Sequence, residues 1–191
     1  MRRNMISRRN FVVLGAGAMG LAACDAGLLG NGVGSNGAAR IDARVDATRD
    51  YLQSVYPNTR AIAQNARGIL YMPLVTEMGI GIGGSFGRGA LRINDVTVDY
   101  YSATSASIGL QIGAQQYAHA IFFMTDAALE NFRRSNGWVA GAGVEYATPE
   151  EGGNFGKDTT ELDPVTVFVF GQQGLIVGAT IEGVKYSRII P

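Results

Sequence analysis

The sequence predicts an α+β fold: a mainly antiparallel, strongly curved sheet or partly closed β-barrel, with an N-terminal helical segment and one short internal helix. Two stretches, 79–87 and 107–115, alternate glycine or serine with apolar residues, as a strand with one bare face would. Before residue 56, apolar residues recur at helical spacing instead. Glycine on one face lets strands curve sharply or lets a helix settle against the sheet.

Length and composition predict one folded domain. The chain has 191 residues, of which 47% are apolar and 17% charged, enough to bury one sizeable core. We expect three parts: a signal peptide at 1–23, a lipidated cysteine with a glycine-rich tether at 24–37, and one folded domain at 38–191, whose binding role is taken up below with its family resemblance.

The first 23 residues can be interpreted in two ways. Gly15, Gly17 and Gly20 spell G-x-G-x-x-G after an apolar run, but a dinucleotide site needs a helix directly afterwards, and a glycine-rich stretch follows here. An export signal explains more of the sequence, because Arg8, Arg9 and Phe11 resemble a twin-arginine motif. Residues 11–23 are too few for the ~20 that cross a bilayer. We therefore predict export.

Cys24 is the only cysteine of the chain and so has no partner for an intrachain disulfide. Residues 21–24, Leu-Ala-Ala-Cys, resemble the bacterial lipobox, in which the cysteine is acylated and becomes the mature N-terminus. Two or more acyl chains hold a protein firmly on a membrane, whereas one does so only marginally. We predict acylation of Cys24; the alternative is a free thiol beside an ordinary cleavage site.

The segment 38–55 is predicted to be an amphipathic helix that Pro57 ends. Its apolar stripe either packs on the sheet of the same chain or lies on a lipid surface. Three arginines and three aspartates over 40–50 cancel in charge. The candidate lipid-binding residues on this stripe are Ile41, Val45, Leu52 and Val55.

Further elements follow from local patterns. Residues 59–66 suggest a short second helix, Asn94-Asp95 a hairpin turn, and Thr125-Asp126 the start of a helix that ends near Arg134. Trp138 directly after that helix is expected to anchor the core. Apolar strands are expected at 69–72, 90–93, 96–101, 118–124 and 164–170.

No catalytic, metal or cofactor site is expected. His119 is the only histidine, which excludes a zinc site built with a second histidine or cysteine, and no G-x-S-x-G motif is present. The acidic stretch 150–163 does not match an EF-hand loop. The open alternative is a hydrolase that uses His119. Without the first 23 residues, 12 basic residues face 16 acidic ones, which disfavours nucleic acid as the partner.

A set of short motifs resembles the SYLF domain over roughly residues 38–190. The most specific are 109–115, Gly-Leu-Gln-Ile-Gly-Ala-Gln, and 135–138, Ser-Asn-Gly-Trp; the others lie at 67–73, 79–91, 100–102, 123–125, 158–160, 169–175 and 181–183. The resemblance implies lipid binding with no known catalysis. Eukaryotic members bind phosphoinositides and bundle actin, and a basic amphipathic helix is thought to meet the membrane. Because the charges of 38–55 balance here, phosphoinositide and actin binding are expected by family analogy only.

The function expected from the sequence is therefore that of a bacterial envelope lipoprotein. We expect it to be exported and held on the periplasmic side by acylated Cys24, with a non-catalytic domain that binds a phospholipid or fatty acid. The alternative is a structural or scaffolding module that binds other envelope proteins.

Overall fold

The computed structural model describes residues 36–141, 145–146, 163–171, 174–175 and 181–191, without the side chains of 79–82, 107–114, 145–146 and 174–175. The chain divides into two units, Met1–Gly30 and Asn31–Pro191, and the description below concerns the second. The predicted export residues Arg8, Arg9 and Phe11, and the predicted lipidation site Cys24, lie outside the described residues.

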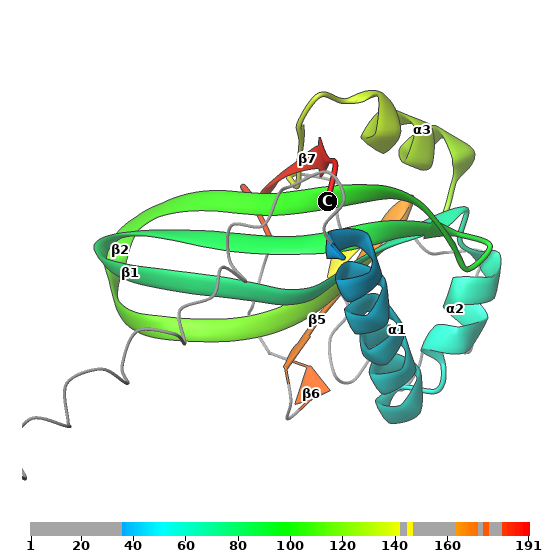
Figure 1. The fold of residues 1–191 in the computed structure, drawn as a ribbon, viewed down its shortest axis with the longest axis horizontal. Helices are drawn as coiled ribbons and strands as arrows, with labels where there is room; N and C mark the ends of the chain where they lie inside the picture. The colour runs from blue at the N-terminus through cyan, green and yellow to red at the C-terminus, as the bar shows by residue number, and fades with distance from the viewer. Residues whose placement is uncertain (1–35, 142–144, 147–162, 172–173, 176–180) are drawn as a thin grey trace, which may run out of the picture. The chain divides into compact units, whose positions relative to one another are not determined.

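A long antiparallel hairpin of β1 (Gly68–Ile93) and β2 (Val96–Phe123) forms the centre of the sheet. The start of β2 also pairs with β7 (Lys185–Ile189), and its end pairs with β5 (Val165–Gly171). Short strands extend both sides: β3 (Trp138–Val139) on β7, and β4 (Glu145–Tyr146) and β6 (Gly174–Leu175) on β5. All pairs but β4 with β5 are antiparallel. The result is a strongly curled half-barrel (Figure 1), which confirms the predicted fold class.

The hairpin corrects one expectation. The short strands expected at 69–72 and 90–93 are the two ends of the single 26-residue β1, and register shifts at Met72/Val75, Ile80/Gly81 and Leu91/Arg92 mark irregularities along it. The predicted turn is confirmed: Asn94 and Asp95 have φ of 49° and 64°. Such left-handed angles at both central residues belong to the tight turn whose twist matches paired strands.

Glycines allow β1 to fold back on itself. A Cβ on Gly89 would overlap the carbonyl oxygen of Tyr71 and lie 2.5 Å from the sulfur of Met72, and one on Gly87 would lie 2.9 Å from the carbonyl oxygen of Leu74. The two halves of the strand therefore approach with no room for a side chain between them. This is the close backbone approach that the glycine-rich pattern indicates.

The inner face of the curled sheet holds the larger core, which α3 (Asp126–Arg134) covers. Thr125 caps α3 as predicted, since its side chain accepts a hydrogen bond from the Ala128 amide at 3.2 Å. Phe132 lies at the centre of an aromatic group, with ring centroids 4.7 Å from Tyr101, 4.7 Å from Phe123 and 5.5 Å from Trp138. Trp138 packs against this core, as expected.

The outer face is covered by α1 (Gly37–Val55) and α2 (Thr59–Asn65) (Figure 1). The second core lies beneath them and contains Ile41, Val45, Leu52, Ile62, Ile69, Tyr71, Ala90, Ala120, Phe122, Phe168 and Phe170. Both cores lie entirely within Asn31–Pro191, so this unit has the apolar interior that an independently folding domain needs. Within the described part of the chain, no helix combines the length and hydropathy needed to cross a membrane.

Candidate functional site

The predicted lipid-binding stripe of α1 faces the protein. Ile41, Val45 and Leu52 are 8%, 1% and 1% exposed and belong to the outer-face core, whereas Val55 is 42% exposed. Contact of the first three side chains with lipid would require α1 to leave the sheet. That these four residues bind lipid stays a prediction.

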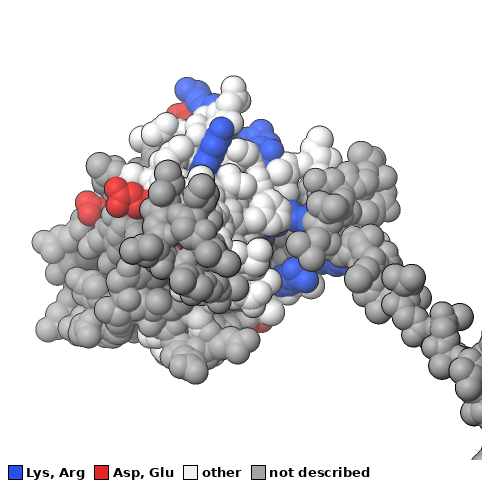
Figure 2. Space-filling view, turned by 90° about the vertical axis from the view of Figure 1, so that its left-hand side faces the viewer, with Lys and Arg blue, Asp and Glu red and all other residues white. Residues whose placement is uncertain are grey.

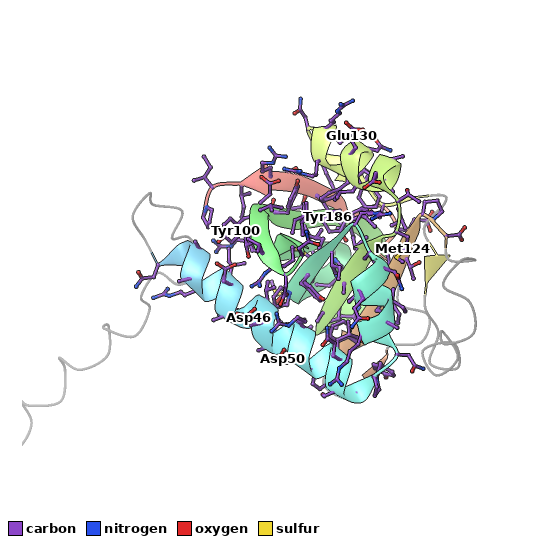
Figure 3. All side chains as sticks on the ribbon, turned by 90° about the vertical axis from the view of Figure 1, so that its right-hand side faces the viewer. Asp46, Asp50, Tyr100, Met124, Glu130 and Tyr186 are labelled. Atoms are coloured by element: carbon purple, nitrogen blue, oxygen red, sulfur yellow. The ribbon has the colours of Figure 1, made fainter. Side chains whose placement is uncertain are left out.

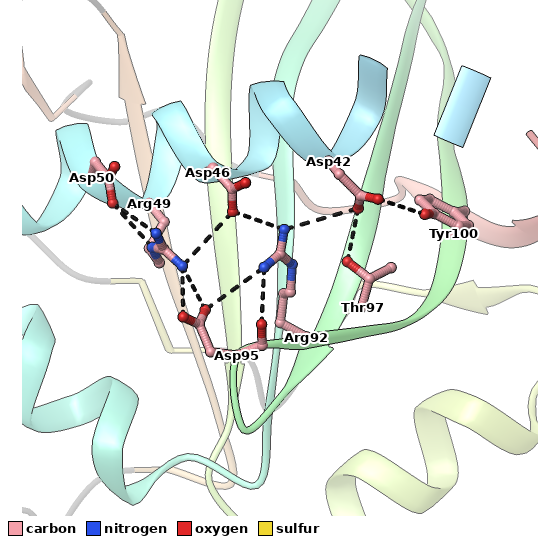
Figure 4. A network of polar contacts seen from close by, with 8 residues as sticks. All are labelled: Asp42, Asp46, Arg49, Asp50, Arg92, Asp95, Thr97 and Tyr100. Atoms are coloured by element: carbon pink, nitrogen blue, oxygen red, sulfur yellow. Dashed lines mark hydrogen bonds and ion pairs between the residues drawn. The ribbon is translucent and has the colours of Figure 1, made fainter. Parts of the chain in front are cut away.

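Polar side chains fix α1 across the sheet. Asp42 accepts hydrogen bonds from the Thr97 hydroxyl and the Tyr100 hydroxyl, both at 2.8 Å (Figure 4). Burial, followed by this hydrogen bond to a carboxylate, raises the pKa of Tyr100 to about 12, so the phenol keeps its proton at neutral pH. One helical turn further, Asp46 accepts from the Arg92 guanidinium at 2.8 Å. In Figure 3, Asp46 lies on α1 and Tyr100 lies on the sheet near the start of this helix.

The same set of contacts includes the hairpin turn. Arg49 of α1 donates to both carboxylate oxygens of Asp95 at 2.7 Å, and Arg92 donates to the Asp95 main-chain carbonyl at 2.9 Å. The hydrogen bond with Asp95 raises the pKa of Arg49 above its usual value. We call these residues the helix clamp: Asp42, Asp46, Arg49, Arg92, Asp95, Thr97 and Tyr100 (Figure 4).

The clamp engages aspartates of α1 with the sheet and leaves two arginines of the helix in solvent. Asp42 and Asp46 contact the sheet, while Arg40 and Arg44 are exposed and form no ion pair with the described residues. The segment is balanced in composition, but Asp42, Asp46 and Asp50 are engaged in hydrogen bonds or ion pairs, whereas Arg40 and Arg44 form no ion pair with the described residues. No local sequence pattern indicates this arrangement, because the partners of the aspartates lie 46 to 58 residues away in the chain.

His119 lies inside the half-barrel and is 0% exposed. Its Nε2 is 2.7 Å from the Tyr186 hydroxyl, and its Nδ1 has no hydrogen-bond partner among the described residues. Burial lowers the pKa of His119 from 6.5 to about 3, which keeps the ring neutral. Its hydrogen bond goes to a tyrosine of the core (Tyr186, Figure 3), so this geometry supports a structural role and gives no support to the hydrolase alternative.

Metal ligation and a concavity beside α3 are two other features of the described residues that bear on ligand binding. No group of three or more histidine, cysteine, aspartate or glutamate side chains among them could hold a metal ion. A concavity of about 390 Å³ beside α3 is lined by Asp126, Leu129, Glu130, Arg133, Arg134 and Arg188. Its arginines are already paired: Arg133 and Arg188 lie 3.3 Å from Asp99, and Arg134 pairs with Glu130.

Comparison with known families decides the relationship. A family model described as Ysc84, Las17-binding protein actin regulator, matches residues 104–188. Residues 104–188 belong to this SYLF family. The match runs from β2 to β7 and confirms the resemblance found in the sequence. No curated protein matches the chain.

The SYLF match covers only part of the described fold. It includes most of β2, helix α3 and the strands that follow, but not α1, α2 or β1. The helix clamp therefore joins a segment before the match to the start of the matched strand and the turn in front of it. SYLF domains are known as binding modules, so a binding role is the general statement that the match supports.

Proposed function

We propose that this protein is a lipid-anchored protein of the bacterial cell envelope, exported to the periplasmic side, whose SYLF domain binds phospholipid or a fatty acid without catalysis. The observation that carries the proposal is the lone Cys24, which follows a segment that resembles a twin-arginine signal and precedes the SYLF match at residues 104–188 in the same chain. Acylation of Cys24 would supply the anchor, and the domain the lipid contact.

The anchor is tested by the intact mass of the protein extracted from membranes. We expect a chain that begins at Cys24 and carries the added mass of acyl chains, and a Cys24→Ser variant that lacks them. An unmodified, full-length chain recovered from the cytosol would refute export and anchoring together.

The lipid-binding role needs a separate test. The chain from residue 24 onward with Cys24→Ser contains both cores, so it is suited to co-sedimentation with vesicles of bacterial phospholipids. We expect binding that does not depend on the acyl chain. If no bacterial lipid retains this chain, the lipid function is wrong while the anchor stands.

The second candidate is a protein-interaction module of the envelope. It is favoured by the matching family, which is described by Las17 binding and actin regulation. Actin binding itself comes to this chain by family analogy alone. Recovery of a specific envelope protein in a pull-down at ordinary salt, by a chain that does not bind vesicles, would favour this candidate.

A further inference from the structure

We infer that the domain contacts an anionic phospholipid bilayer through its outer face beside α1, while α1 stays docked on the sheet. This inference rests on the proposed lipid function and assigns it to a surface. We call this surface the bilayer-contact surface; it consists of Arg40, Arg44, Leu74, Met78, Phe86 and Arg88.

The apolar part of this surface lies on β1. Leu74, Met78 and Phe86 are 40%, 60% and 46% exposed. Phe86 and Arg88 alternate with Ala90, which packs under α1, so they point to the outer face. Val75 points into the inner core, and no register shift separates it from Met78, which puts Met78 on the outer face by the same alternation. Leu74 lies beside Val75 within the register shift at Met72/Val75 and is exposed there.

The two halves of β1 bring these side chains together. The Cβ position of Gly87 lies 2.9 Å from the carbonyl oxygen of Leu74, so Leu74 is adjacent to the segment that carries Phe86. The Arg88 guanidinium lies 5.8 Å from the centre of the Phe86 ring. An exposed aromatic ring next to a cation suits the boundary between acyl chains and headgroups, where one part of the surface is apolar and the other charged.

The charge of this face favours an anionic surface. Arg40 and Arg44 are four residues apart on α1, and the clamp residues Asp42 and Asp46 are engaged with the sheet. Figure 2 views the domain from the left-hand side of Figure 1 and shows Lys and Arg toward the top and right of the described atoms, with Asp and Glu mostly toward the left. Each basic residue close to an anionic membrane strengthens binding about fivefold.

The start of α1 lies close to the bilayer-contact surface. Tyr100 contacts Asp42 near the start of α1 and pairs with Ala90, and Phe86 lies four residues along β1 from Ala90, about 13 Å away. Residues 25–36 span at most ~43 Å. An acylated Cys24 would hold the domain within this distance of the bilayer, where a high effective concentration makes a small contact sufficient. This proximity is why we assign a bilayer, and not a second copy or a soluble partner.

The surface is not part of the family match. All six residues precede residue 104, where the SYLF match begins. The inference also differs from contact through the apolar stripe of α1, because Ile41, Val45 and Leu52 remain buried.

Position-specific labelling tests the surface directly. Cys24 is the only cysteine, so a chain from residue 24 with Cys24→Ser and Met78→Cys can carry one environment-sensitive dye at position 78. On addition of vesicles with equal parts phosphatidylethanolamine and phosphatidylglycerol, we expect a blue shift of its emission. A matched label at Ile190→Cys, where the native side chain is 80% exposed, should not shift.

Substitutions test the same assignment by affinity. Leu74→Ser with Phe86→Ser should weaken co-sedimentation about tenfold, because roughly half of each apolar side chain loses its burial in lipid. Arg40→Gln with Arg44→Gln should weaken binding to phosphatidylglycerol vesicles, and added salt should remove the difference from the parent chain. Arg134→Gln on α3, exposed and outside the surface, is the matched control.

The outcomes separate the surface from the function. Binding by the parent chain that the β1 substitutions leave unchanged, or a dye shift at 190 and not at 78, overturns the surface and leaves lipid binding intact. Failure of the parent chain to bind any vesicle overturns both. A dimer in solution that Phe86→Ser converts to a monomer would assign this face to a second copy and overturn the bilayer contact.

Discussion

The two faces of the curled sheet are closed by different means. On the inner face, the two halves of β1 meet backbone to backbone at Gly87 and Gly89, and an aromatic core fills the interior. On the outer face, a separate helix lies over the core and is held in part by ion pairs and hydrogen bonds. Both faces therefore bury a core, but the outer face is less completely covered and has exposed side chains available for contacts.

The largest effect on stability should come from adding a side chain where the two halves of β1 meet. Gly89→Ala places a methyl group against the Tyr71 carbonyl and the Met72 sulfur, so the strand halves must separate. We expect a loss of about 3 kcal/mol in the free energy of unfolding, measured by urea denaturation. Gly141→Ala is the control, since nothing lies within 4 Å of its Cβ position. Equal stability of the two variants would contradict the close approach of the two halves of β1.

Next in size is the effect of acid on the inner face. The pKa of His119 is lowered from 6.5 to about 3 in the folded chain, so on acidification the unfolded chain takes up the proton first. The contribution of His119 to the free energy of unfolding is fully present above pH ~6.5. Below that pH it falls by up to ~1.4 kcal/mol per pH unit. His119→Gln should therefore flatten the fall in stability between pH ~6.5 and ~4.5 by about 2 kcal/mol. Parallel pH profiles for variant and parent would show that the ring is not kept neutral.

The helix clamp should contribute less to the free energy of unfolding than the contact between the two halves of β1. Arg92 is 11% exposed and lies at the centre of the clamp, so Arg92→Leu leaves Asp46 without its hydrogen bond. We expect a loss of about 1–2 kcal/mol. Arg134→Leu, which breaks the exposed pair with Glu130, should cost no more than about 0.5 kcal/mol. Hydrogen exchange in α1 would locate the loss, which should leave the amides of α3 protected.

The smallest effect on stability is expected at the bilayer-contact surface. Met78 is 60% exposed, so Met78→Ser should change the free energy of unfolding by no more than about 0.5 kcal/mol. A large loss would place Met78 in a packed environment and would contradict its assignment to a contact surface. Thermal unfolding of the chain from residue 24 measures this, and an intact fold makes the vesicle experiments interpretable.

Several elements could be predicted because their signals are local. The turn at Asn94-Asp95, the cap at Thr125 and the helix stop at Pro57 depend on backbone preferences of a few neighbouring residues. The fusion of short strands into β1 and β2 could not be predicted, because bulges interrupt the alternation and only pairing across the hairpin shows that one strand continues.

The candidate site was predicted less well than the fold. The apolar stripe at Ile41, Val45 and Leu52 has the same sequence pattern whether it packs on lipid or on a sheet, because the burial of apolar area is not directional. The structure packs these three residues against the outer face, and leaves Leu74, Met78 and Phe86 exposed on a strand where no sequence pattern singles them out.

By itself the sequence determined the fold class, the ends of the helices, the SYLF resemblance and the expectation of an export signal ending at Cys24, because each depends on residue types at short spacing. Only the tertiary structure decided that Gly89 meets Tyr71, that Asp42 and Asp46 bond side chains of the sheet, and that Arg40 and Arg44 are exposed. These contacts join residues far apart in the chain. Their partners are chosen by how the sheet curls, which no local pattern encodes.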